Sequence, residues 1–286
     1  FIEYWNLRGL DNAEVVYAAL VEKLGTKTHP LLTRAVLVRR LADIAADSNR
    51  FDRLLQKIGK ASASYFAELV DSILEREIER KWTDRAEEGV HRPLLDIAQH
   101  HLLLSMIAVE MAVATSSQIS FEELKLVTEL FCDSQKLSPQ INKQVTARIF
   151  DHPLLSKPDS NSNGICFDHE EFREFFLGEA IGQYVASGKL SDILSLFRKS
   201  VMSESVVDAC VGMLKATNAD TGNSINLLQS VIMADNVASY AKETRSKIIM
   251  RLIQQSGVRD VVVSDAYIGP EALIGIQINQ ITFKNC

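Results

Sequence analysis

Apolar residues recur at helical spacing along most of the chain. Between residues 65 and 81 they stand at i, i+3, i+4, i+7, i+8 and i+12, with charged residues on the opposite side, which predicts an amphipathic helix. Ser120 with Glu123 predicts a capping box at the start of a second helix. Ser138 followed by Pro139 predicts an N-cap with proline at the first helical position. The fold class is therefore mainly α, with further helices at about 11–24, 30–46, 93–115, 169–186, 203–216 and 237–255.

Two stretches depart from the helical pattern. Residues 154–167 hold two short apolar runs around a segment rich in Asn, Asp, Pro and Gly, which predicts a small β-hairpin with a polar tip. Residues 258–286 contain 12 Val, Ile, Thr, Tyr or Phe among 29 positions, a composition typical of strands. A boundary near Gly257 is expected to open this β-rich unit. Alternate positions within it are isoleucine: Ile274, Ile276 and Ile278.

Composition and charge limit the classes of protein that fit this chain. The chain has 286 residues, 47% of them hydrophobic and 24% charged, a balance that can bury a core without disulfides or metals. Its net charge of −6 does not support a nucleic-acid-binding surface. The four cysteines lie far apart, without a metal-ligand or disulfide pattern, which is typical of reduced thiols in the cytoplasm.

No segment predicts a membrane span or a secretory leader. The longest apolar stretch, residues 102–114, is too short for a bilayer and contains Glu110. The chain starts at Phe1 rather than methionine, and it ends within the strand-like segment 277–286. We therefore expect it to be a segment of a longer cytoplasmic protein, with some of that protein's activity housed elsewhere.

The sequence contains no recognisable catalytic motif. A phosphate-binding P-loop needs G-x-x-x-x-G-K-[ST], and neither Gly59-Lys60 nor Gly188-Lys189 has the required first glycine or the final Ser or Thr. Serine-nucleophile elbows and H-E-x-x-H pairs are absent as well. His100 and His101 are adjacent on a predicted helix, about 100° apart, so they are expected to be structural rather than to share a metal. An enzyme complete within these residues is not expected.

One formal match to a calcium loop falls at the hairpin tip. The D-x-[DN]-x-[DN]-G-x5-E spacing of an EF-hand is met by Asp159, Asn161, Asn163, Gly164 and Glu170. An EF-hand also needs a continuous helix running into its first Asp, and Pro153 and Pro158 interrupt that segment. Cys166 stands where a branched apolar residue normally pairs two loops. We favour a plain hairpin tip and keep calcium as the less favoured alternative.

The most informative segment follows the hairpin, at residues 167–176. Asp168 is expected to be the N-cap of the next helix, with Glu171 completing a capping box. His169 would then occupy the first helical position, where free backbone amides and the helix dipole favour anions. A histidine there is expected to stay neutral and still donate one N–H to a phosphate. The alternative is that His169 is an ordinary polar residue of a first turn.

This hairpin followed by F-x-H-x-x-F-x-E-F-F resembles the winged-helix end of NACHT-type signal-transduction ATPases, the STAND class that includes Nod-like receptors. Thr28-His29-Pro30-Leu31-Leu32 resembles the proline-bearing start of their first helical subdomain, and Asp151-His152-Pro153-Leu154-Leu155 resembles the approach to the wing. The order covers roughly residues 1–187. The resemblance implies a helical subdomain at 1–115, a winged-helix-like domain at 116–187, a helical arm at 188–257 and the start of a β-rich, repeat-like unit at 258–286.

The resemblance also implies a function. In such proteins the winged-helix histidine contacts the β-phosphate of ADP, and the proline lies beside the nucleotide base; these positions fall on His169 and Pro30. The chain itself would not be an enzyme, because it lacks Walker A and Walker B motifs, and ADP or ATP would be shared with an upstream P-loop ATPase domain before Phe1. Implied partners are that domain, C-terminal sensor repeats and further copies on activation, in innate immunity or antiviral defence.

Two other functions stay open. The lack of a clustered catalytic set and the stacked helices near 189–256 favour a helical scaffold that binds proteins without nucleotide. The 159–170 loop alone favours a calcium-binding regulator. A Walker A motif upstream of Phe1 would favour the nucleotide switch over the scaffold.

Overall fold

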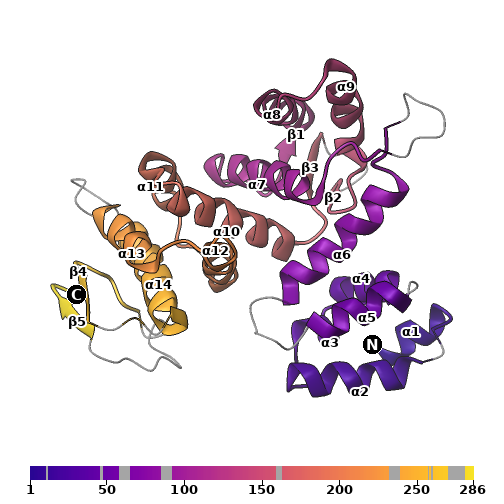
Figure 1. Cartoon of the computed structure of the whole chain (residues 1–286), viewed down its shortest axis with the longest axis horizontal. Helices are drawn as coiled ribbons and strands as arrows, with labels where there is room; N and C mark the ends of the chain where they lie inside the picture. The colour runs from indigo at the N-terminus through magenta and orange to yellow at the C-terminus, as the bar shows by residue number, and fades with distance from the viewer. Residues whose placement is uncertain are drawn as a thin grey trace. The chain divides into compact units, whose positions relative to one another are not determined.

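The computed structural model is mainly α, as the sequence predicts, with fourteen α-helices among the residues it describes (Figure 1). These are all residues except 11, 46–47, 58–64, 85–91, 159–162, 232–238, 257, 259 and 270–280. The chain forms two compact units, Phe1–His100 and His101–Cys286, and each is described by itself. The four-part division stays a prediction, and the expected boundary at Gly257 lies outside the described residues.

The first unit is helical. Trp5 is fully buried and packs edge-on against Phe51, with ring centroids 5.6 Å apart. The expected helix at 30–46 is broken at Arg34 into two helices, and the helix predicted between residues 65 and 81 is confirmed. Before helix α7, the bounds are α1 (Ile2–Leu7), α2 (Ala13–Leu24), α3 (Pro30–Thr33), α4 (Ala35–Ala45), α5 (Ser48–Lys57) and α6 (Tyr65–Arg80).

The second unit begins with helices around a small three-stranded sheet of order β1-β3-β2. The predicted hairpin is confirmed by antiparallel β2 and β3, and β1, which the sequence did not predict, pairs with the other edge of β3. The capping box of Ser120 and Glu123 is confirmed, as is the N-cap at Ser138. The elements are α7 (Ile97–Val113), β1 (Ile119–Ser120), α8 (Phe121–Ser134), α9 (Pro139–Arg148), the 3-10 turn η1 (Ile149–Asp151), β2 (Leu155–Ser156), β3 (Gly164–Phe167) and α10 (Glu170–Ala186).

Four more helices and a parallel strand pair complete this unit. Helix α10 packs closely along α12, and both also contact neighbouring helices of the array. The isoleucines at 274, 276 and 278 lie outside the described residues, but strands do form on both sides of them. These elements are α11 (Leu190–Phe197), α12 (Glu204–Ala216), α13 (Thr221–Ser230), α14 (Ser239–Ser256), β4 (Val261–Ser264) and β5 (Ile281–Lys284).

The four cysteines are free thiols in contrasting environments. Burial raises the pKa of the Cys210 thiol to about 12, and burial together with Asp133 raises the pKa of Cys132 to about 11. Cys286 is exposed. At pH 8 we expect iodoacetamide to label Cys286 in the native protein, and to label Cys132 and Cys210 at least about a hundredfold more slowly, since the thiolate is the reacting species. Mass spectrometry of native and urea-unfolded samples checks this, and equal native rates would contradict it.

Candidate functional site at the start of helix α10

The start of helix α10 is set by the hairpin before it. Strand β3 ends at Phe167, but the N–H of Asp168 still donates to the carbonyl oxygen of Leu154, at 2.8 Å. This bond extends the strand pairing by one residue. The helix therefore begins at Glu170 with His169 as its N-cap, in an extended conformation of φ −150° and ψ 150°. The expectation of an Asp168 N-cap and a His169 at the first helical position is wrong by one residue.

The imidazole of His169 caps the helix. Its Nδ1 accepts a long hydrogen bond of 3.5 Å from the backbone N–H of Glu171, and the carboxylate of Glu171 contacts the same nitrogen. The side chain is 37% exposed. When Nδ1 accepts the backbone N–H, a neutral ring carries its proton on Nε2. When the ring is protonated, Nδ1–H faces the Glu171 carboxylate instead, so the local charge selects between two states of the cap.

The acidic first turn of α10 is partly neutralised within the helix. Arg173 Nε lies 3.1 and 3.0 Å from the two carboxylate oxygens of Glu170, and its Nη2 contacts the same group. Glu170 therefore has a cationic partner in the structure, rather than standing free for calcium. Asn163 is exposed at the end of the tip, and Asp159 and Asn161 lie outside the described residues. The calcium hypothesis is not tested further by these positions.

Pro30 belongs to the first unit. It is the first residue of the short helix α3, and the turn is closed by bonds from the N–H groups of Leu32 and Thr33 to the carbonyl oxygen of His29, at 2.8 and 3.2 Å. A proline suits this position because its missing N–H has no helical partner there. Pro30 and His169 lie in different units, so their joint contact with a nucleotide stays a prediction.

Three other histidines take part in packing contacts, and two of them, His100 and His152, are buried. The ring of His100 meets Trp82 edge-on, with centroids 4.6 Å apart. His101 Nδ1 lies 2.8 Å from Glu179 Oε2, beside two phenylalanines of α10. His152 Nδ1 accepts the N–H of Leu154 at 3.2 Å and shapes the turn into β2. These contacts agree with the structural role expected for the adjacent pair His100 and His101.

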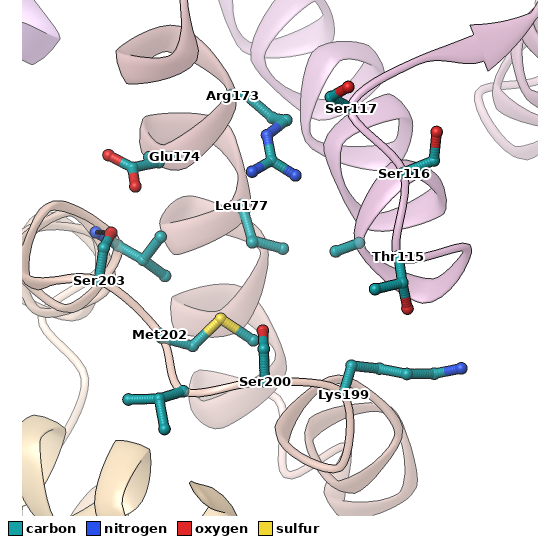
Figure 2. Close-up of a pocket in the computed structure, with 13 residues that line it drawn as sticks. Thr115, Ser116, Ser117, Arg173, Glu174, Leu177, Lys199, Ser200, Met202 and Ser203 are labelled. Carbon is teal, nitrogen blue, oxygen red and sulfur yellow. Dashed lines mark hydrogen bonds between the residues drawn. The ribbon is translucent and has the colours of Figure 1, made fainter.

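A cavity of about 290 Å³ lies one turn further along α10 (Figure 2). It is bounded by the end of α7, by α10 and by the segment leading into α12. In Figure 2 the guanidinium of Arg173 points between α10 and the 115–117 segment, while Lys199 and several hydroxyl groups lie around the rim. Its size is at the small end for ligand pockets. No local motif predicts it, because its walls come from segments about 90 residues apart and meet only through tertiary packing.

The site has no clustered metal ligands in the part of the chain that the structure describes. Among the described helices, none is long and apolar enough to cross a membrane. Comparison of the chain with models of protein families, with curated proteins and with solved structures found no match. What the fold and site define is a class: a mainly α protein with a small antiparallel sheet that is followed by a histidine-capped helix.

Proposed function

We propose that this chain is the regulatory segment of a nucleotide-dependent switch. In this proposal His169 contacts the β-phosphate of ADP bound to an upstream ATPase domain and holds a closed, inactive state. Pro30 lies beside the base. The segment connects the nucleotide to a C-terminal sensor, and release of ADP favours an open form able to oligomerise.

The N-cap position of His169 carries the proposal. The side chain is partly exposed at the positive end of a helix of 17 residues, where the helix dipole attracts anions. The neutral ring with Nδ1 as acceptor would present Nε2–H as a donor, which suits a phosphate oxygen. The Glu170–Arg173 pair neutralises one of the two carboxylates of this first turn, while the Glu171 carboxylate stays in contact with His169 Nδ1, on the opposite ring edge from the proposed donor Nε2–H.

The packing of α10 supplies a way to transmit the contact. Its glycines Gly178 and Gly182 face the backbone of α12, so the two helices approach too closely to slide independently. A displacement of His169 on gaining or losing the phosphate contact would then move α10 and α12 together as one rigid pair. A rigid pair with two positions is the kind of element that a two-state switch requires.

Replacing His169 by alanine should weaken ADP retention in the intact protein that carries the ATPase domain. A hydrogen bond to a charged group contributes about 1.5–3 kcal/mol, so the Kd for ADP should rise by about tenfold to a hundredfold. Spontaneous activation should rise with it. Isothermal titration with ADP, beside measurement of the nucleotide that co-purifies, checks both. His169→Gln is the matched variant, because it keeps an N–H donor and should lose less.

The same substitution in the 286-residue chain should change stability little. The cap bond is long and the side chain is partly exposed, so the loss should lie near the low end for an N-cap, about 0.5 kcal/mol. Equal ADP affinity in wild type and His169→Ala would contradict the proposed contact between His169 and the β-phosphate. If the free energy of unfolding of the isolated chain fell by several kcal/mol, His169 would instead be a structural residue that stabilises the hydrophobic core.

The second candidate is a helical scaffold that binds proteins without nucleotide. The observation that favours it is the C-terminal parallel strand pair, whose outer strand β5 is largely exposed. Nucleotide content separates the two candidates. Tight ADP in the intact protein favours the switch, and the absence of nucleotide there favours the scaffold.

A further inference from the structure

The two C-terminal strands, β4 and β5, pair in parallel. Val261 lies beside Ile281, and the register continues to Ser264 beside Lys284, so paired residues are 20 positions apart. The sequence between them repeats every five residues. Branched or aromatic apolar residues recur at that interval: Val263, Ile268, Leu273, Ile278 and Phe283. Four such intervals add up to the 20 positions that separate paired residues of β4 and β5.

Residues 262–267 have an inner and an outer side. Val263 is fully buried and Ala266 is 5% exposed, whereas their neighbours Val262 and Tyr267 are 39% and 54% exposed. Val263 and Ala266 therefore point inward, whereas Phe283, which pairs with Val263 one repeat later on β5, is 39% exposed. An inner and an outer side are the pattern of a coil that wraps around its own apolar axis, as in parallel β-solenoids.

Backbone corners repeat as well. Asp260, Asp265 and Asn285 have positive φ angles of 60°, 52° and 55°. Asp and Asn accept this left-handed conformation better than most residues. The first two stand five positions apart, and Asp265 and Asn285 stand 20 apart, at equivalent places in successive turns. The N–H of Asp265 also donates to the carbonyl oxygen of Lys284 at 2.8 Å, continuing the pairing beyond the strands.

An α-helical crossover is the common alternative for parallel strands. The connecting sequence does not favour it, because Gly269, Pro270 and Gly275 interrupt any helical run. The described start of the connection, residues 265–269, is not helical. A coil with five-residue sides explains both the register and the sequence repeat, whereas a crossover helix explains only the parallel direction.

The two edges of the β4–β5 strand pair differ. On the β4 side, Gln229 Nε2 donates to the carbonyl oxygen of Val262 at 2.8 Å, and Arg245 Nη2 donates to those of Ser264 and Asp265 at 3.1 Å each. Helices α13 and α14 thus cap that edge with side chains. On the other side, Phe283 is 39% exposed, and β5 pairs with β4 alone within the described part of the chain. An uncapped edge is a template for another strand.

We propose that the parallel pair of β4 and β5 is the start of a parallel β-solenoid, capped on its β4 edge, and that the free edge of β5 is a docking surface for a further coil of the same repeat. The occupant is a parallel strand with apolar residues two positions apart, recurring every five residues. The capped β4 edge fixes the direction of growth, and the 20-residue register fixes which residues stack. This inference does not depend on nucleotide binding.

The test appends a second copy of residues 267–286 directly after Cys286 in the full chain. The new coil should place its strand beside β5, so the β5 amides that face away from β4 should exchange hydrogen at least tenfold more slowly. Hydrogen-exchange mass spectrometry of the 281–284 segment measures this. The matched control appends the same 20 residues in an order that abolishes the five-residue repeat, and it should leave exchange unchanged.

Two results would overturn the proposal. Equal exchange at 281–284 in both appended chains would show that the repeat does not direct pairing. Protection of this segment in the original chain that increases with protein concentration would make a second copy the occupant instead. Size-exclusion chromatography over a hundredfold concentration range detects that association.

Discussion

Replacing Gly178 by alanine should destabilise the second unit by about 3 kcal/mol, because the added methyl group would overlap atoms of helix α12. A Cβ at this position would lie 2.5 Å from the carbonyl oxygen of Val206, 2.6 Å from the Cβ of Ala209 and 3.0 Å from the backbone nitrogen of Cys210. Two of these three atoms belong to the backbone of α12. Relief therefore requires the two helices to move apart rather than one side chain to turn.

Gly182, one helical turn later, is packed against α12 in the same way. A Cβ there would lie 2.8 Å from the carbonyl oxygen of Cys210 and 2.8 Å from the Cβ of Met213. Glycines four apart lie on one face of a helix, so together they allow α10 and α12 to approach closely. Gly182→Ala should also be destabilising, but less so, since its nearest atoms lie at 2.8 Å, whereas those of Gly178 lie at 2.5 and 2.6 Å.

Gly212 provides the matched control for the effect of alanine in a helix. It lies inside α12, and a Cβ there would meet nothing within 4 Å. Gly212→Ala should raise stability by up to about 1 kcal/mol, since glycine loses more conformational freedom on folding. Gly178→Ala should lower the melting temperature by about 6–12 °C in a unit of this size. Calorimetry of both variants checks this, and similar shifts for the two would contradict the close packing.

Local signals in the sequence were enough for many helix starts. Ser120 with Glu123, and Ser138 before Pro139, satisfy backbone groups within four residues, so no distant partner decides them. The hairpin was predictable for the same reason, since its turn residues lie between its two apolar runs. Strand β1 was not, because two residues form a strand only when β3 is already beside them.

The start of helix α10 at the candidate site depends on a tertiary contact that nearby residues do not predict. An Asp168 N-cap was a sound expectation from residues 168–171, but the bond from Asp168 to Leu154 belongs to the sheet and moves the helix start by one residue. The sequence did contain an unused signal for the α10–α12 contact. Gly178 and Gly182 are spaced four apart within a predicted helix, where glycine otherwise lowers stability. Such a pair indicates close packing, though not which helix packs there.

Replacing Arg245 by alanine should be the most damaging substitution in the C-terminal part of the chain, at about 3 kcal/mol. Arg245 is fully buried within α14, and its Nη2 donates to the carbonyl oxygens of Ser264 and Asp265, at 3.1 Å each. Burial lowers the pKa of its guanidinium to about 10, against an opposing effect of Asp265. The group is still charged at neutral pH, so its removal leaves the two part-buried carbonyl oxygens without their donor, and a large void in place of the side chain.

Arg251 separates this effect from the general loss of an arginine. It lies on the same helix, is 31% exposed, and pairs with Glu204 and Asp208 at 3.0 and 3.1 Å. Exposed pairs of this kind contribute at most about 1 kcal/mol, so Arg251→Ala should be mild. Urea unfolding of both variants gives the difference, and hydrogen exchange at 261–264 shows where it arises. If Arg245→Ala left β4 protected as in wild type, the carbonyl contacts would not be what holds the strand pair to α14, and the cap would have to rest on Gln229 and apolar packing alone.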